Sequence, residues 1–200
     1  MLKITVGPMY AGKTSTLMTE FEACSDSKVI IDFNTNEETT CNMSVITNHD
    51  NISIPCIRSK FLYDTLNIYK KTGNFQISHD FFHINENMID LYDIHDKVKF
   101  SRNIFINEAQ FFPDLYKFVT DNFHKNIYLY GLDGDFKRQP IGQLLDLVPL
   151  CDTIIKLTAT CMCGEKAIFT HRNSSEEEQY VPNASYMPCC RMCYYKKNKK

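Results

Sequence analysis

Eight residues near the N-terminus have the types and spacing of a phosphate-binding loop. The run Gly7-Pro8-Met9-Tyr10-Ala11-Gly12-Lys13-Thr14 fits the pattern G-x-x-x-x-G-K-S/T. Glycines at both ends of the run allow backbone angles that point successive amide N–H groups at phosphate oxygens. The lysine would reach the β- and γ-phosphates, and the threonine hydroxyl would ligate Mg²⁺. Unless the match is a chance glycine loop, it predicts a site for the triphosphate of ATP.

A second polar group follows the apolar run Asn103–Ile106. Phosphoryl transfer commonly uses a carboxylate near Mg²⁺ and a group that accepts the proton of the attacking hydroxyl. Glu108 can accept that proton, but position 107, where Asp would serve the metal, is Asn107. The amide still offers an oxygen, without the negative charge. Alternatively, Asn107 is a helix cap and Glu108 a first-turn residue.

Cysteines gather near the C-terminus, where residues 161–193 hold five of the nine. Cys190-x-x-Cys193 has the spacing of one half of a tetrahedral zinc site. Cys161-Met162-Cys163 has one intervening residue, and a tighter turn would let both thiolates reach one ion. We expect Cys161, Cys163, Cys190 and Cys193 to bind structural zinc. Two alternatives are Cys189 as a replacement ligand and reduced thiols without metal.

These residues need elements that position them, and the sequence predicts an α/β fold. Short apolar runs that could be covered on both faces alternate with helical patterns, which is typical of a mostly parallel sheet. A helix over Thr14–Cys24 would present an apolar stripe after the phosphate loop. In such sheets ligands bind at the carboxyl ends of the strands, where the loop and Glu108 both lie. The predicted strands are Leu2–Val6, Lys28–Ile31, Asn103–Ile106, Ile127–Tyr130 and Thr153–Leu157.

Two segments break this alternation. Residues 33–57 are rich in Asn and Thr without any Lys or Arg, and they predict a long irregular segment. Residues 59–102 hold one predicted helix, Lys60–Lys71, followed by His79, His83 and His95. The spacing of these histidines fits no metal-ligand pair, so we interpret them as ordinary surface or core residues.

Bulk composition narrows the classes of partner. The 200 residues carry a formal net charge of -2, which gives no overall positive field for binding nucleic acid. A basic end at 196–200 is expected to be a solvated tail. No apolar run approaches the ~18 residues of a membrane span, and the N-terminus does not resemble a signal peptide. We therefore expect a cytoplasmic protein whose thiols stay reduced.

Five blocks resemble the thymidine kinase family of the cytosolic and poxvirus type. They occur in the family's order and cover roughly half the chain. The first is the phosphate loop, and the second resembles the family's catalytic segment. The last two are similar to its zinc-binding end. The blocks are Gly7–Thr14, Glu108–Asp114, Leu132–Gly142 running on to Leu147–Leu150, Lys156–Cys163 and Cys190–Tyr194.

The resemblance implies transfer of the ATP γ-phosphoryl group to the 5′-hydroxyl of thymidine or deoxyuridine with Mg²⁺. By position, Glu108 would take the hydroxyl proton, and Phe136 would stack on the thymine ring. A lasso loop over Glu178–Pro182 would bind the base through main-chain groups. The resemblance also implies a homotetramer inhibited by deoxythymidine triphosphate. The implied ATP-binding set adds Asn107 and Gln110 to the loop, and the implied substrate-binding set adds Glu178, Gln179, Tyr180, Val181, Pro182 and Tyr186 to Phe136.

The expected organisation is a P-loop parallel sheet with helices on both faces, plus a small zinc-ribbon-like lasso domain. The kinase domain would span 1–157, with 59–102 as an extended connection longer than the family's. The lasso domain would span 158–195, and a basic tail 196–200.

The chain departs from the family pattern at several positions, two of which carry charge in the family. Asn107 replaces an Asp, and the family's Lys-Asp-x-Arg segment is reduced to Phe33–Asn36 without the Arg. The lasso glycine pair is replaced by Pro182-Asn183. A degenerate nucleotide-binding relative with little turnover is therefore the alternative to a working kinase. Candidates to replace the lost charges are Asp50, Asp133 and Asp135 for the metal, and Lys137 and Arg138 for the phosphates.

Overall fold

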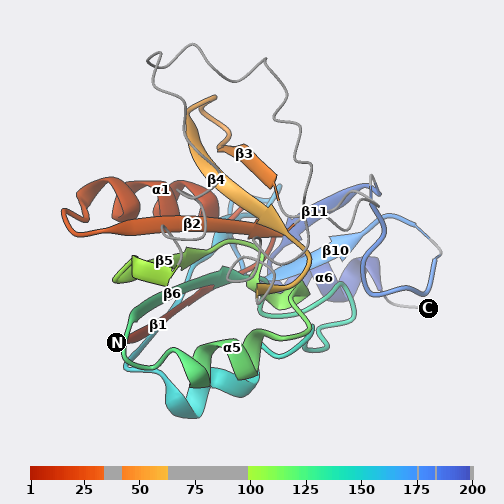
Figure 1. Cartoon of the computed structure of the whole chain (residues 1–200). Helices are drawn as coiled ribbons and strands as arrows, with labels where there is room; N and C mark the ends of the chain where they lie inside the picture. The colour runs from red at the N-terminus through yellow and green to blue at the C-terminus, as the bar shows by residue number, and fades with distance from the viewer. Residues whose placement is uncertain (34–41, 63–98, 175, 183, 199–200) are drawn as a thin grey trace.

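A seven-stranded sheet forms the centre of the molecule (Figure 1). The structure, a computed structural model, describes residues 1–33, 42–62, 99–174, 176–182 and 184–198. The strand order is β3-β4-β2-β5-β6-β1-β7, and every neighbouring pair is parallel except β3 with β4. The strands are β1 (Leu2–Val6), β2 (Lys28–Phe33), β3 (Asn42–Thr47), β4 (Ser53–Ser59), β5 (Asn103–Ile106), β6 (Asn126–Gly131) and β7 (Thr153–Lys156).

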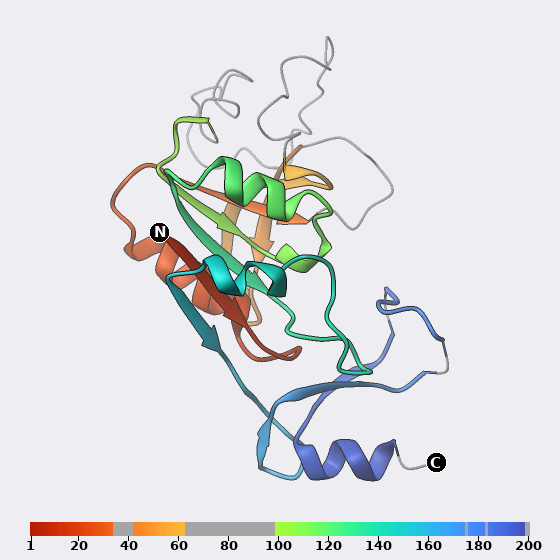
Figure 2. The same ribbon diagram turned by 90° about the horizontal axis from the view of Figure 1, so that it is seen from below.

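Helices cover both faces of this sheet, which confirms the predicted α/β architecture. Helix α1 (Lys13–Ala23) packs Leu17 and Met18 on one face, against buried side chains of β2, β5 and β6. On the other face lie α5 (Leu115–Asp121) and the 3₁₀ segments η2 (Ala109–Phe111) and η3 (Leu145–Leu150) (Figure 2). Because each fully buried Leu, Ile or Phe contributes about 1.5–3 kcal/mol, the two apolar layers fix the strand ends that carry the site.

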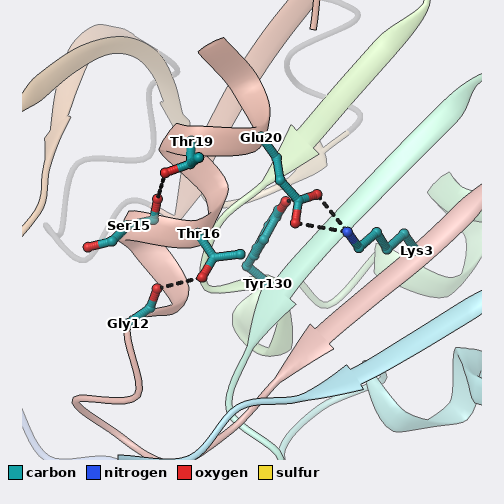
Figure 3. Close-up of polar contacts among 7 residues, drawn as sticks. All are labelled: Lys3, Gly12, Ser15, Thr16, Thr19, Glu20 and Tyr130. Carbon is teal, nitrogen blue, oxygen red and sulfur yellow. Dashed lines mark hydrogen bonds and ion pairs between the residues drawn. The ribbon is translucent and has the colours of Figure 1, made fainter. Parts of the chain in front are cut away.

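Glu20 ties α1 to the sheet (Figure 3). Both of its carboxylate oxygens accept a hydrogen bond from Lys3 Nζ of β1 at 2.8 Å. Tyr130 of β6 donates its hydroxyl proton to Glu20 Oε2 at 3.1 Å. One turn earlier on the helix, the Thr16 hydroxyl donates to the Gly12 carbonyl at 3.0 Å. The helix that follows the phosphate loop is therefore held against two central strands.

Short strands and a helix make up the C-terminal part. β8 (Ala159–Thr160) pairs with β9 (Lys166–Ala167), and β10 (Phe169–Arg172) pairs antiparallel with β11 (Tyr186–Cys189). Helix α6 (Arg191–Lys197) follows directly. Several hydrogen bonds join this part to the rest, among them one from Met9 N to Thr170 Oγ1 at 3.1 Å and one from the Tyr194 hydroxyl to the Phe136 carbonyl at 2.5 Å.

The prediction of an irregular segment over residues 33–57 was wrong for residues 42–57, while residues 34–41 lie outside the described residues. β3 and β4 form an antiparallel hairpin there, and β4 also pairs in parallel with β2. Ile46, Ile54 and Cys56 are buried in the layer that also contains α1. Val, Ile and Thr favour strands, and burial of one hairpin face outweighs the polar neighbours. The Asn48 side chain closes the turn by accepting from the backbone N–H groups of Asp50 and Ile52.

The last predicted strand and the segment 59–102 have different outcomes. The predicted strand Thr153–Leu157 is present as β7, but it lies at the sheet edge with Ile154 46% exposed, so two-sided burial was wrong there. Residues 63–98, with most of the predicted Lys60–Lys71 helix and the three histidines, lie outside the described residues. Among the residues that are described, no helix has the length and apolar character needed to cross a bilayer.

Candidate active site

The carboxyl ends of β2, β5 and β6 surround a cavity of about 420 Å³. The phosphate loop closes one side, the β3–β4 hairpin another, and a residue of the lasso reaches in from the C-terminal part. This position agrees with the general site for ligands in open parallel sheets. Its lining comprises Met9–Ser15, Asp32, Phe33, Ile46, Thr47, His49, Arg58, Asn107, Glu108, Phe111, Leu132 and Tyr180.

The phosphate loop joins β1 to α1 with the backbone that its glycines allow. Gly12 has a φ of 79°, in the left-handed region, and opens α1. A Cβ on Gly7 would lie 2.7 Å from the Leu157 carbonyl oxygen, so a side chain there would displace backbone. Gly12 therefore adopts a left-handed backbone and Gly7 has no room for a side chain, and both features favour glycine as the phosphate-loop motif requires.

Lys13 is buried beneath the loop. Its Nζ donates to the carbonyls of Gly7 and Pro8 at 3.2 and 2.8 Å. Burial lowers the pKa of this ammonium group, while the nearby charges of Glu108 and Asp133 act in the opposite direction. The Lys13 ammonium group is therefore held at the loop, close to the position that phosphate oxygens would occupy.

Glu108 has a strained backbone and a firmly held side chain. Its φ is 50°, a region that costs a non-glycine residue about 1–3 kcal/mol. Gln110 Nε2 donates to Glu108 Oε2 at 2.7 Å, and the Leu132 N–H donates to Gln110 Oε1 at 3.0 Å. Glu108 precedes η2 without any side-chain capping bond. The capping interpretation is therefore not what the structure shows; the carboxylate lines the cavity instead.

Gln110 holds the Glu108 carboxylate through this hydrogen bond, and we expect its removal to have a measurable consequence. Gln110→Met keeps the side-chain length but deletes the amide that holds the carboxylate. Because a hydrogen bond to a charged group contributes about 1.5–3 kcal/mol, we expect kcat to fall about 10- to 100-fold. The KM for ATP should stay within about threefold in steady-state assays, since Gln110 is absent from the cavity lining.

The matched control for this substitution is Gln143→Met. The Tyr116 N–H at the start of α5 donates a hydrogen bond to Gln143 Oε1 at 3.0 Å, at an exposed position outside the cavity. It should leave kcat unchanged. If Gln110→Met altered only the melting temperature and not kcat, the positioning role would be lost.

Sequence reasoning missed Asp32, which lines the cavity at the end of β2. Asn107 Nδ2 donates to its Oδ1 at 2.8 Å, and Arg58 Nε donates to its Oδ2 at 3.2 Å. Burial raises the pKa of this carboxyl, and the Asn107 hydrogen bond and the Arg58 charge counteract that effect. The available signal was its position directly after an apolar strand, like that of Glu108 after β5.

None of the five residues considered as replacements for lost charge lines the cavity. The Asp133 carboxylate pairs with Lys156 at 2.6 Å. The Asp135 carboxylate accepts from two backbone N–H groups of its own turn at 2.8 and 2.7 Å. Arg138 donates to the Tyr195 hydroxyl, and Lys137 to the Glu177 carbonyl. The fifth, Asp50, lies in the β3–β4 turn.

The lasso contributes Tyr180 to the cavity. Its ring lies 4.9 Å from the ring of Phe111 and is nearly parallel to that of Tyr186. The Val181 N–H donates to the Tyr186 hydroxyl at 2.9 Å, which holds the loop close to β11. The Gln179 amide donates to the Asp135 carboxylate at 3.2 Å, while the side chains of Glu178 and Pro182 are exposed.

Phe136 is not among the residues that line the cavity. Its ring lies 3.8 Å from the guanidinium of Arg172, which also donates to the main-chain carbonyls of Glu176 and Glu178. Arg172 is almost fully buried, so it joins Phe136 to the lasso main chain. The structure therefore brings Glu108, the phosphate loop and Tyr180 together, and holds Phe136 beside the lasso.

Four thiols meet between the β8–β9 turn and α6. The Sγ atoms of Cys161, Cys163, Cys190 and Cys193 all lie within 4.8 Å of one another. A tetrahedral zinc with Zn–S bonds of about 2.3 Å requires sulfurs about 3.8 Å apart, so the four thiols fit this ion. Backbone N–H groups of Cys163 and Cys190 lower the pKa of the Cys161 thiol to about 6. Cys189, the alternative ligand, is outside this group.

Comparisons with known proteins agree with one another. The family model described as thymidine kinase matches residues 62–194. The chain is 33% identical over 198 residues to thymidine kinase a of Arabidopsis thaliana, which covers 96% of this chain and 73% of that protein. It is 31% identical over 205 residues to the thymidine kinase of Yaba monkey tumor virus, covering 98% and 96%. A match to cytosolic thymidine kinase of Homo sapiens is 43% identical over 97 residues, covering 46% and 42%.

Proposed function

This chain belongs to the thymidine kinase family, and from that membership we propose that it transfers the γ-phosphoryl group of ATP to the 5′-hydroxyl of thymidine or deoxyuridine. One observation supports the proposal most strongly. Lys13 of the phosphate loop, the Glu108 carboxylate and the Tyr180 ring of the lasso line a single cavity. A triphosphate and a nucleoside would meet there, with a proton acceptor between them.

The phosphate loop binds the triphosphate through the amide N–H groups of Gly7–Thr14 and the start of α1. Lys13 turns from the Gly7 and Pro8 carbonyls toward the β- and γ-phosphates. The Thr14 hydroxyl would hold Mg²⁺, which would supply positive charge beside the transferring group. Glu108 accepts the proton of the 5′-hydroxyl as the new P–O bond forms.

At the nucleoside end, the base lies against Tyr180 and the main chain of Glu178–Pro182. Main-chain N–H and C=O groups can pair with both donors and acceptors at a pyrimidine edge. By the family resemblance Phe136 would stack on the base with the ring face opposite Arg172, from its place beside the lasso and not from the cavity lining. The hydrogen bond between Val181 and Tyr186 and the Arg172 contacts with Glu176 and Glu178 order this loop before substrate binds.

Further parts of the proposal concern cofactors and assembly. Cys161, Cys163, Cys190 and Cys193 bind one structural Zn²⁺. The kinase domain ends at 157 and the zinc-binding lasso domain spans 158–195. Several matched relatives carry the word cytosolic in their names, and we place this chain in the cytoplasm. The homotetramer and inhibition by deoxythymidine triphosphate rest on the family resemblance.

A nucleoside panel tests the proposal. Purified protein is incubated with ATP, Mg²⁺ and, separately, thymidine, deoxyuridine, deoxycytidine or deoxyadenosine. Thymidine and deoxyuridine should give the 5′-monophosphate and one ADP for each product molecule. ATP binding without any monophosphate would instead favour the degenerate relative. Among the described residues nothing favours that alternative, because the phosphate loop and Glu108 share one cavity.

A further inference from the structure

Three charged or polar side chains form a row across the ends of β4, β2 and β5. In the parallel pair β2–β5, Ile31 is in register with Ile106, so the next residues, Asp32 and Asn107, are neighbours. In the pair β2–β4, Asp32 is itself in register with Arg58. Hydrogen bonds of 2.8 and 3.2 Å join the row, with Asp32 at its centre. All three side chains line the cavity of the phosphate loop.

Asp32 retains capacity to bind a cation. Its side chain is only 9% exposed, and each carboxylate oxygen accepts one hydrogen bond from the row. Two carboxylate oxygens offer about four lone-pair sites, so these two partners, together with the Phe33 backbone N–H, still leave one free. Asn107 uses its Nδ2 on Asp32, which makes its amide a support for the carboxylate.

We propose that Asp32 supplies, from β2, the negative charge toward the Mg²⁺ of the nucleotide that Asn107 on β5 lacks. This inference rests on the proposed phosphotransfer at the same site. Glu108 is the other carboxylate in the cavity lining, and its place in the reaction is to accept the hydroxyl proton. Mg²⁺ prefers one or two carboxylates together with phosphate oxygens, and Asp32 meets that requirement.

Arg58 has a complementary role in this arrangement. Its Nε holds Asp32, and its Nη2 donates to the Val45 carbonyl at 3.2 Å, which fixes the guanidinium at the cavity wall. The positive charge of Arg58 partly balances the buried Asp32 carboxylate before nucleotide binds. The competing explanation is that Asp32 and Arg58 are only a structural ion pair, which would not respond to metal.

Metal binding to the complex with ATP separates these explanations. Mn²⁺ replaces Mg²⁺ and is titrated by electron paramagnetic resonance into protein saturated with ATP, without nucleoside. Asp32→Asn should weaken Mn²⁺ binding about 10- to 100-fold. Binding of ATP in EDTA should stay within about threefold. The exchange variant Asp32→Asn/Asn107→Asp moves the charge one strand over and should restore Mn²⁺ affinity.

Asp152→Asn is the matched control for loss of one carboxylate. Asp152→Asn removes a carboxylate that accepts from the Leu2 N–H at the opposite end of β1, and it should change nothing. If Asp32→Asn lowers the melting temperature because Arg58 has lost its partner, Asp32→Asn/Arg58→Met removes both charges and is titrated instead. Unchanged Mn²⁺ affinity in either folded variant overturns the proposal. Wild-type protein that binds Mn²⁺ and ATP but phosphorylates no nucleoside overturns the proposed function alone.

Discussion

Replacing Glu108 by Gln is expected to lower kcat for thymidine by about 10²- to 10⁴-fold, the usual contribution of a positioned general base. Glutamine has the same shape, and Gln110 Nε2 can still donate to its carbonyl oxygen, as it now does to Glu108 Oε2 at 2.7 Å. The side chain would therefore keep its place but could not accept the hydroxyl proton. The cavity and the strained backbone at φ 50° would be retained.

Kinetics and binding together isolate this effect. Single-turnover phosphorylation of thymidine measures the chemical step, and calorimetry measures ATP binding, which should change less than about threefold. Glu22→Gln on the exposed side of α1 is the control for loss of one negative charge. A Glu108→Gln enzyme whose turnover stays within about threefold of the wild type would remove the proton-acceptor role.

Features that depend on neighbours in sequence were predictable. Apolar runs located β1, β2, β5 and β6 to within a few residues, and the phosphate-loop motif located the start of α1. The four zinc-site cysteines also follow from local spacing, and the structure brings their sulfurs together. For the strands and the phosphate loop, a short local pattern contains the physical cause, either one buried face or one turn. For the zinc site only the two cysteine pairs are local, and the fold joins them across the 27 positions from Cys163 to Cys190.

Features that depend on strand register were not predictable. Asp32 and Asn107 are 75 residues apart, and Asp32 and Arg58 are 26 apart. Only the parallel pairing of β2 with both β4 and β5 makes them adjacent, and no spacing in the sequence specifies that pairing. The hairpin that carries Arg58 was also missed because its Asn- and Thr-rich composition resembles a loop. The sequence prediction therefore assigned the charge absent at position 107 to Asp50, Asp133 or Asp135, and none of these lines the cavity.

Phe136 is a second residue whose side chain is placed by a contact distant in sequence. A turn after β6 puts its backbone at the ligand edge, as the sequence indicates. Its ring is then directed by Arg172, which lies 36 positions further along the chain on β10 and is 3% exposed. Because the contact joins the two parts of the chain, its effect on the base site depends on how firmly the C-terminal part is folded.

Removing zinc is therefore expected to have the second large effect. The C-terminal part has a small core of its own, formed by Cys161, Ala167 and Cys190 with two partly buried neighbours. A cluster of that size cannot hold two short strand pairs and one helix, whereas a structural zinc contributes about 10–16 kcal/mol at pH 7. Chelation should unfold this part and raise the KM for thymidine more than the KM for ATP. The phosphate loop is joined to this part by the hydrogen bond from Met9 N to Thr170 Oγ1.

Two cysteine variants test the assignment of the ligands. Cys163→Ser should lower bound zinc well below one ion per chain by mass spectrometry and increase amide exchange in β8–β11 and α6. Cys189→Ser alters a buried neighbour outside the four-thiol group and should keep the full zinc content. Wild-type protein purified with far less than one zinc per chain, yet with a protected C-terminal part, would contradict the zinc site. The lasso would then depend on Arg172 and Tyr186, whose hydrogen bonds to Glu176, Glu178 and Val181 need no metal.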